Sequence, residues 1–132
     1  MSSSEQIHEN SSPSRTVTNF MEHFNNADEE SLNSTFDSPC VFIIDNKTNV
    51  FEKYTDAVSF DSLRKNGWSY SRINTIEPLY EDKETAMVQF SFSRFTKDDC
   101  EISRTDATHL LVCRGNCWKI KVVFIHGHLT LR

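Results

Sequence analysis

The sequence predicts an α+β domain in which the helices gather on one side of a curved, mostly antiparallel sheet. Apolar residues recur at helical spacing in residues 14–26, 28–36 and 55–65, whereas residues 69–126 hold long runs in which apolar and polar residues alternate. The last two runs flank Arg114-Gly115-Asn116, and three connecting residues that include a glycine are a hairpin signal. An order in which helices precede the long strands is typical of the α+β class.

Length and charge limit the classes of protein to consider. The 132 residues fit a single domain, which we expect at residues 14–132. The formal net charge is −5 and no cluster of Lys and Arg exceeds two consecutive residues, so we expect no nucleic-acid partner. The longest apolar runs, at 40–44 and 122–125, are far shorter than the roughly 20 residues of a membrane span. The Ser-rich start of the chain has no apolar leader, so we expect a cytoplasmic protein and no membrane partner.

The four cysteines are expected to be free thiols, because their spacing lacks the paired C-x-x-C sets of a zinc site. A three-residue hairpin loop would place Cys113 opposite Cys117 on the outer face, so a cross-strand disulfide is the alternative. His126 and His128 form an H-x-H pair, but no spacing supplies a third metal ligand. The sequence also lacks a phosphate loop and a nucleophile elbow, so we expect neither a metal nor a cofactor.

Two short helices are expected before the first strand. Residues 1–13 are polar and aperiodic, which indicates a disordered tail. Ser14 is the expected N-cap of a helix that ends at Asn25-Asn26. Its apolar stripe consists of Val17, Phe20, Met21 and Phe24. Asp28 is the expected N-cap of a second helix, which turns Leu32 and Phe36 inward.

A hairpin and a third helix are expected next. Residues 40–44 are β-branched and aromatic, which predicts a buried strand. The polar cluster at 45–49 is typical of a turn, and Val50-Phe51 is the expected return strand. The third helix is then expected from Thr55 or Asp56 to Lys65, with Asn66-Gly67 as its stop.

Two long strands are expected before the final hairpin. The first spans residues 69–80, where Pro78 favours an edge position or a bulge. The second spans residues 84–96, and apolar residues alternate with polar ones along it. Its core face is expected to hold Ala86, Val88, Phe90 and Phe92. Arg94 extends this core face at the far end of the strand.

In the final hairpin, alternation predicts one core face and one outer face. The core face is expected to hold Thr108, Leu110, Val112, Trp118, Ile120, Val122 and Phe124. The outer face is expected to hold His109, Cys113, Cys117, Lys119 and Lys121. Arg104, Asp106 and His126 continue the core face beyond its hydrophobic middle. Charged and polar side chains in phase with a core wall indicate that the core opens into a pocket there.

Four segments, combined with the order of the elements, resemble a known superfamily. They are Ala27-Asp28, Asn66-Gly67-Trp68, the run from Val88 to Phe95 and the segment from Thr108 to Ile120. Together they resemble the nuclear transport factor 2-like superfamily, which includes polyketide cyclase-like and ketosteroid isomerase-like proteins, over about residues 14–127. The most similar members are its uncharacterised bacterial proteins. The resemblance implies a cone, in which a bent sheet wraps over the helices around a cavity, and often a dimer through the outer sheet face.

The resemblance also allows a residue-by-residue test for isomerase activity. A ketosteroid isomerase-like site has a general-base Asp near the end of the first strand, where Asp45 lies in this sequence. Such a site also has a Tyr on the first helix and a second acid on the strand before the final hairpin. Here the first helix has Phe20 and Phe24 instead of Tyr. Thr108 stands at the place of the second acid, with Asp106 one pleat away, which argues against isomerisation.

Three residues are candidate catalytic groups: Asp106, His126 and Asp45. Asp106 is the strongest candidate, because a buried carboxyl gains the raised pKa that acid/base chemistry uses. A salt bridge from Asp106 to Arg94 or Arg104 is the alternative. His126 is a candidate base or proton relay, with a position at the rim of the pocket as the alternative.

Eight residues are candidate ligand-binding groups: Arg94, Arg104, Thr108, Tyr54, Trp68, Trp118, Phe42 and Phe90. The favoured function is binding of a small apolar or aromatic molecule in the cavity without catalysis, because the polar set is sparse. The alternative is an acid/base enzyme of lyase, isomerase or hydrolase type that acts on a small organic substrate in the same cavity. Met87, His109 and Leu111, expected on the outer face, predict a homodimer through it.

Overall fold

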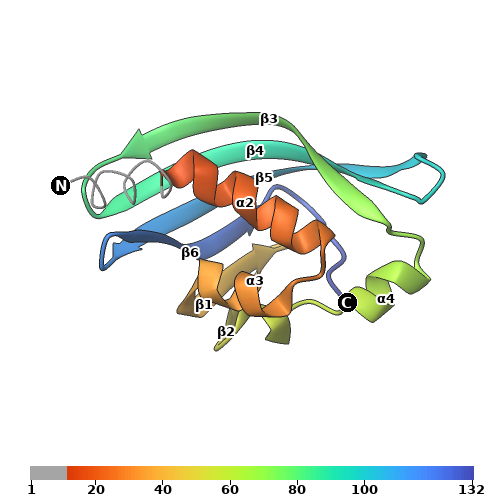
Figure 1. The fold of residues 1–132 in the computed structure, drawn as a ribbon, viewed down its shortest axis with the longest axis horizontal. Helices are drawn as coiled ribbons and strands as arrows, with labels where there is room; N and C mark the ends of the chain where they lie inside the picture. The colour runs from red at the N-terminus through yellow and green to blue at the C-terminus, as the bar shows by residue number, and fades with distance from the viewer. Residues whose placement is uncertain (1–11) are drawn as a thin grey trace.

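The computed structural model describes residues 12–132, which form helices and one six-stranded sheet (Figure 1). The helices are α2 (Pro13–Asn25), α3 (Glu29–Thr35), the 3₁₀ helix η1 (Tyr54–Asp56) and α4 (Phe60–Lys65). The strands are β1 (Phe36–Ile44), β2 (Lys47–Phe51), β3 (Tyr70–Glu81), β4 (Thr85–Phe95), β5 (Glu101–Arg114) and β6 (Cys117–Ile125). This order confirms the predicted α+β class.

The helix α2 begins earlier than predicted. Its N-cap is Ser12 instead of the expected Ser14. The side chain of Ser12 accepts a hydrogen bond of 3.2 Å from the backbone N–H of Arg15. Pro13 occupies the first helical position, where its fixed φ suits the helix and its missing N–H costs nothing. The predicted tail, residues 1–13, lies outside the described residues except for Ser12 and Pro13.

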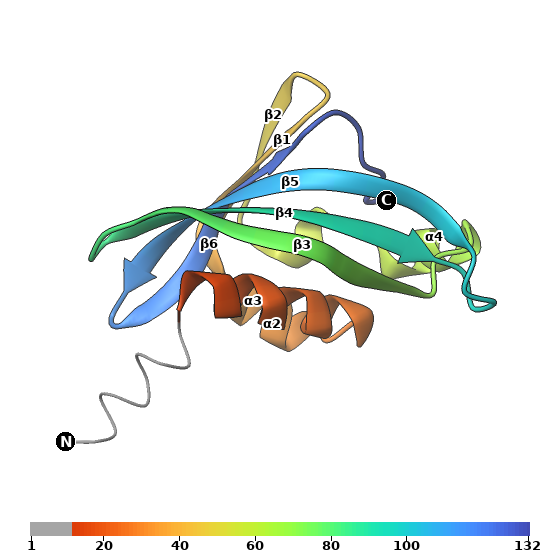
Figure 2. The same ribbon diagram turned by 90° about the horizontal axis from the view of Figure 1, so that it is seen from above.

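The sheet has the strand order β2-β1-β6-β5-β4-β3. The pair β1–β6 is parallel, and all other neighbouring strands are antiparallel. Figure 2 shows β3, β4 and β5 bending over α2, which lies along their concave side. Within residues 12–132, no helix is long and apolar enough to span a bilayer.

The core lies between α2 and the concave side of the sheet. All four residues of the predicted α2 stripe are buried, and so are the predicted core residues of β4. Phe20 is the hub of this core, because its ring centroid lies 5.3–6.0 Å from those of Phe24, Phe36, Tyr54 and His109. Edge contacts between aromatic rings stabilise such clusters beyond the burial of their area. The core therefore consists mainly of aromatic rings.

The predicted phase of β5 is wrong. Ala107, His109 and Leu111 face the core with at most 1% exposure, whereas Asp106 is exposed on the outer face. The hairpin loop has two residues, Gly115 and Asn116, both at positive φ, and not three. A one-residue error in register moves every side chain to the other face. Because β5 carries apolar residues on both faces around position 110, the alternation could not correct that error.

A bulge in β6 changes its phase part-way along the strand. Leu111 pairs with Ile120 but Leu110 pairs with Val122, so Lys121 is the extra residue. Ile120 is therefore buried as predicted, whereas beyond the bulge Val123 and Ile125 take the core positions expected for Val122 and Phe124.

The true register also separates Cys113 from Cys117. Cys113 pairs with Trp118 and Cys117 pairs with Arg114, so the two thiols point to opposite faces of the hairpin. All four cysteines are free thiols. The alternative of a cross-strand disulfide is therefore wrong.

Candidate functional site

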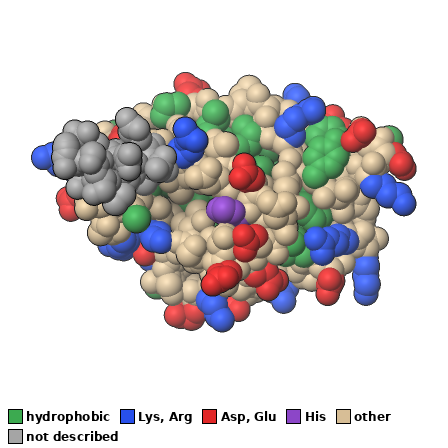
Figure 3. All heavy atoms as spheres, viewed as in Figure 1, with side chains coloured by type: hydrophobic (Ala, Val, Ile, Leu, Met, Phe, Trp, Pro, Cys, Tyr) green, Lys and Arg blue, Asp and Glu red, His purple; other side chains and the backbone are tan. Residues whose placement is uncertain are grey.

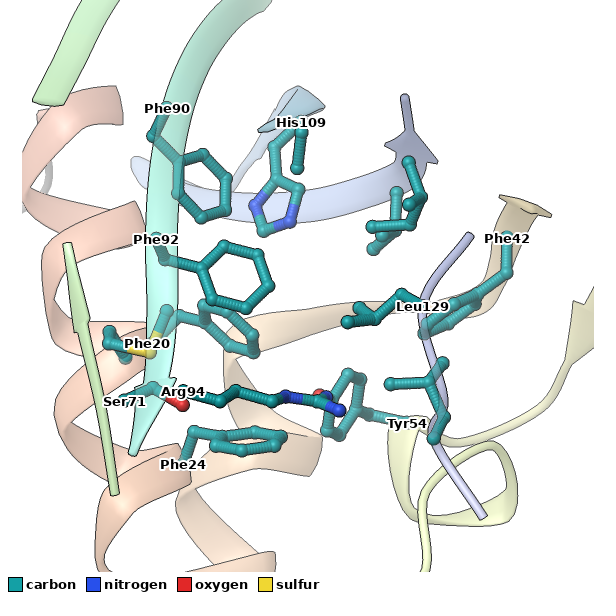
Figure 4. A pocket seen from close by; sticks show the side chains of 15 residues that line it. Phe20, Phe24, Phe42, Tyr54, Ser71, Phe90, Phe92, Arg94, His109 and Leu129 are labelled. Atoms are coloured by element: carbon teal, nitrogen blue, oxygen red, sulfur yellow. The ribbon is translucent and has the colours of Figure 1, made fainter. Parts of the chain in front are cut away.

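A small cavity lies inside the cone between α2, the sheet and residues 129–131. Most of its walls are aromatic side chains: Phe20, Phe24, Phe42, Tyr54, Phe90 and Phe92 (Figure 4). Ser71, Arg94 and His109 are its polar groups. The cavity volume is ≈ 30 Å³, which is enough for water but not for an organic molecule. We call it the inner cavity.

Arg94 is the most unusual residue of the inner cavity. It occupies the last core-facing position of β4 and is only 6% exposed. Its Nη1 donates a hydrogen bond of 2.6 Å to the carbonyl of Thr130, while its Nε has no hydrogen-bond partner. Burial lowers the pKa of the Arg94 guanidinium, and the nearby Tyr54 opposes this shift. The ion pairs of the described residues do not include Arg94.

His109 lies on the core face of β5 and is only 1% exposed. Its ring meets Phe90 edge-on at 4.8 Å and Phe20 at 5.3 Å. Its Nδ1 has no hydrogen-bond partner, and burial lowers the pKa of the imidazole to about 3. His109 is therefore neutral at pH 7 and presents one unpaired ring nitrogen.

Tyr54 comes from η1, on the opposite side of the cavity from β4. It is 2% exposed, and its ring stacks on Phe36 at 4.3 Å. Figure 4 shows its ring beside the guanidinium of Arg94. Burial raises the pKa of the Tyr54 phenol far above its usual range, and the charge of Arg94 offsets part of that shift. The phenol therefore stays protonated and can serve as a donor.

A larger, open space lies on the other side of Arg94 and Leu129, which line both spaces. This outer cleft has a volume of ≈ 420 Å³ and lies between the end of α4, residues 102–105 of β5 and residues 128–130. Trp68 and Leu63 provide apolar wall, and Arg104 and His128 stand at its edge. Among the described residues, no Asp or Glu lines either space.

The lack of acid in the outer cleft contrasts with the rest of the surface. The chain has a formal net charge of −5. Figure 3 shows acidic side chains gathered near α2 and α3, where Asp28, Glu29 and Glu30 lie around the first turn of α3. A cleft lined by basic groups in an acidic protein attracts anions locally.

Residues 126–132 cross the mouth of the inner cavity without regular secondary structure. Leu129 and Leu131 are half-buried and pack against the core. Three backbone carbonyls hold this segment: Gly127 accepts from the N–H of Asp45, Thr130 from Arg94, and Leu131 from the N–H of Ser59 at 2.8 Å. We call residues 126–132 the strap, and its leucines separate the inner cavity from solvent.

The structure brings together six of the predicted site residues. Tyr54, Phe42, Phe90 and Arg94 line the inner cavity, and Trp68, Arg104 and again Arg94 line the outer cleft. The predicted ion pair from Arg94 or Arg104 to Asp106 is wrong, because Arg104 lies 3.9 Å from Glu101 and Arg94 has no carboxylate partner. The binding roles of these residues remain predictions.

The other five candidates lie away from both spaces. Asp106 is exposed on the outer face, since the core phase of β5 belongs to its odd-numbered neighbours. Thr108 lies on that face too, where its Oγ1 is 2.8 Å from Nε2 of His126. Asp45 is exposed in the β1–β2 turn and bonds to Nδ1 of His128. Trp118 is half-buried near the end of the hairpin, beside residues of α2 and α3.

Sequence reasoning missed His109 and the strap leucines. His109 alternates with Ala107 and Leu111, which is a core phase, but the neighbouring phase with Leu110 and Val112 is equally apolar. In the strap, Leu129 and Leu131 alternate with polar residues, and this alternation could have predicted a half-buried segment. Within residues 12–132, no group of three or more His, Cys, Asp or Glu could hold a metal ion.

Residues 11–128 match the family model described as NTF2-like protein (DUF6841). The chain belongs to this family of NTF2-like proteins. The predicted resemblance to the nuclear transport factor 2-like superfamily is thus confirmed, and the bent sheet over α2 is the expected cone. No curated protein matches the chain.

Solved structures agree with the family assignment. An NTF2-like protein with a cystatin-like fold from Novosphingobium aromaticivorans superposes with a TM-score of 0.69 at 10% identity, covering 88% of this chain and 79% of that chain. An NTF2-like protein of unknown function from Shewanella oneidensis gives 0.63 at 16% identity, covering 84% and 93%. A provisionally named ketosteroid isomerase from Shewanella frigidimarina gives 0.58 at 16% identity, covering 83% and 90%. At such identities the similarity establishes the fold alone.

Proposed function

We propose that this DUF6841 protein binds a small organic molecule with an apolar or aromatic body in its cone, without catalysing a reaction. The observation that carries the proposal is that Nε of Arg94, a residue that lines both the inner cavity and the outer cleft, is buried without a protein partner. Nδ1 of His109 is a second such group, in the inner cavity. An unpaired buried polar group destabilises a fold, so each such group requires an explanation. Small-molecule sites combine apolar walls with a few such polar groups.

The two spaces suggest where the molecule would lie. Small-molecule sites typically have volumes of about 300–1,000 Å³. The outer cleft, at ≈ 420 Å³, is in this range, whereas the inner cavity, at ≈ 30 Å³, is not. The ligand would therefore occupy the outer cleft against Arg94 and Trp68. It would reach the aromatic inner cavity only after Leu129 moves, because that side chain separates the two spaces.

A pair of blocking variants tests this proposal. A set of small aromatic and aliphatic compounds is screened by saturation-transfer NMR against the parent and against Ser103→Trp, which fills the outer cleft. Ser91→Trp is the matched control, because Ser91 is also half-buried but faces outward opposite Asp106. We expect hits that Ser103→Trp loses and Ser91→Trp keeps. Hits that survive in both variants, or no hits with the folded parent, would refute the proposal.

The alternative function, an acid/base enzyme of lyase, isomerase or hydrolase type, has less support. Its three candidate catalytic residues, Asp106, His126 and Asp45, do not line the inner cavity or the outer cleft. His109 is the imidazole that the inner cavity offers, and a pKa of about 3 makes it a weak base. The geometry therefore favours binding over catalysis.

We also propose that the protein forms a homodimer through the outer face of the sheet. The outer-face residues expected to drive it were partly wrong, because His109 and Leu111 belong to the core. The register instead aligns one row of apolar side chains across all six strands: Tyr80, Met87, Leu110, Val122, Val41 and Val50. Their exposure ranges from half-buried to 62% at Val50, and exposed apolar rows of this kind favour an interface.

The thiols and the net charge bear on the cellular setting. The four cysteines are free thiols, which suits a reducing compartment, and we propose the cytoplasm. A net charge of −5 supports the proposal that nucleic acid is not a partner.

A further inference from the structure

Arg94 is a buried positive charge without a counter-charge. The side chain is 6% exposed, its one hydrogen-bond acceptor is the neutral carbonyl of Thr130, and no ion pair of the described residues includes it. Buried arginines are usually paired with carboxylates, because desolvation of an unpaired ion is costly. A neutral aliphatic side chain would fill this core position of β4 at less cost. The charge therefore indicates a missing partner.

The free part of the guanidinium suits a bidentate acceptor. Its Nη1 donates to the Thr130 carbonyl, so that hydrogen bond points to the strap. The buried Nε has no acceptor, and with Nη2 it forms two parallel N–H donors in one plane that match the two oxygens of a carboxylate. Arg94 lines both the inner cavity and the outer cleft, so an anion that enters the cleft can reach it.

The surroundings of Arg94 also favour an anion. Arg104 borders the cleft but shares the outer-face phase of Asp106 and lies 3.9 Å from Glu101, so Arg94 is the buried charge that the cleft offers. Trp68 and Leu63 provide an apolar wall beside it. In the part of the chain that the structure describes, no carboxylate lines the cleft to repel an anion or to occupy Arg94.

We propose that the ligand is a small organic carboxylate, whose carboxyl group pairs with Arg94 and whose apolar body lies against Trp68 and Leu63. This inference rests on the proposed binding function and specifies the chemical class of the ligand. One buried positive charge matches one negative charge, so a monoanion fits better than a phosphate, which carries close to two.

Two pairs of probes separate charge from shape. The first pair is 4-phenylbutyrate and its neutral amide, 4-phenylbutanamide, and the second is octanoate and octanamide. Each probe is titrated into ¹⁵N-labelled protein while the Nε–Hε cross-peak of Arg94 and the melting temperature are followed. We expect the carboxylates to bind about tenfold or more tightly than the amides, because charge-assisted bonds are roughly twice as strong as neutral ones. We also expect the Arg94 Nε–Hε peak to shift with the carboxylates alone.

Variants test whether Arg94 is the source of the preference. Arg94→Gln and Arg94→Met are expected to bind each acid and its amide equally. Arg72→Gln is the matched control, because Arg72 lies on the same sheet but is exposed and stacks on Phe95. That control is expected to keep the preference. If one Arg94 variant fails to fold, the other variant and the parent cross-peak still decide the question.

Each remaining outcome overturns a defined part of the reasoning. Equal binding of acids and amides to the parent would overturn the anion inference and leave the proposed function standing. No binding of any probe by the folded parent would refute both. Inorganic phosphate or acetate that shifts the Arg94 cross-peak as strongly as the larger acids would show a site for free anions, and would overturn the organic ligand.

Discussion

Replacing Arg94 by methionine is expected to stabilise the protein. Most core substitutions destabilise, but this one removes a charge that is 6% exposed and has no ion-pair partner. Methionine keeps the unbranched stem that packs beside Phe24, whose ring centroid is 6.0 Å from the guanidinium carbon. The Thr130 carbonyl, which loses its donor, belongs to an exposed residue and can accept a hydrogen bond from water instead.

The expected magnitude follows from two opposing effects. Desolvation of a buried ion costs several kcal/mol, and a hydrogen bond to a charged group returns about 1.5–3 kcal/mol. We therefore expect Arg94→Met to raise the free energy of unfolding by about 1–3 kcal/mol. For a domain of this size, each kcal/mol corresponds to roughly 3–5 °C in melting temperature.

Urea unfolding followed by tryptophan fluorescence measures this change. Arg72→Met is the control, because it makes the same substitution at an exposed arginine that stacks on Phe95 at 4.8 Å. The control is expected to lose about 0.5–1 kcal/mol, the usual contribution of such a contact. A loss of stability in Arg94→Met would show that Arg94 is needed by the fold itself, and would remove the reason for inferring a ligand.

Three further predictions concern the core, its pH response and the outer face. Burial lowers the pKa of His109 to about 3, so the unfolded chain binds a proton that the folded protein does not. The free energy of unfolding should then fall by roughly 3 kcal/mol between pH 6.5 and 4, and His109→Phe should flatten this slope in urea titrations; an unchanged slope would contradict the burial of His109. Phe20→Ala should cost about 3–5 kcal/mol and Trp118→Ala clearly less, because Phe20 is the hub of the core and Trp118 is only half-buried. Similar urea midpoints for these two variants would be inconsistent with the observed packing. Leu110→Lys should convert the proposed dimer into a monomer in sedimentation at micromolar concentration, and a persisting dimer would place the interface elsewhere.

The fold was largely predictable because its signals are redundant. Four apolar positions of α2 and four of β4 each fit one period, so an error of one or two residues in a boundary did not alter the face assigned. In β5 and β6 the assignment depended on one loop length. The two-residue turn at Gly115-Asn116 and the bulge at Lys121 each shift the phase. Gly-Asn is itself a two-residue hairpin signal, which the three-residue interpretation overlooked, whereas the bulge has no strong signature in a single sequence.

The site was less predictable, for a physical reason. Arg94 could be identified because its strand has an unambiguous phase, and aromatic candidates such as Tyr54 and Phe90 lie in the core that surrounds it. The prediction of Asp106 as a site residue depended on the core phase assigned to β5, so correcting the one-residue register error moves it to the outer face. The same register error assigned His109 to the outer face, although it lies in the core. Contacts across the cavity, such as that of the strap with Arg94, depend on a long-range approach that local periodicity does not encode.

In this cone the strap, and not the sheet, closes the inner cavity, and it also contacts Arg94. Seven residues outside the sheet, 126–132, supply the leucines that close the inner cavity and the carbonyl that occupies Arg94. The rings of the aromatic core come from elements other than the strap, and Leu129 and Leu131 pack against them. Substitutions at Leu129 or Leu131 could therefore enlarge or reshape the binding space while the strand register and the core remain intact. An engineer who wants new ligands for this scaffold would randomise these positions before any strand residue.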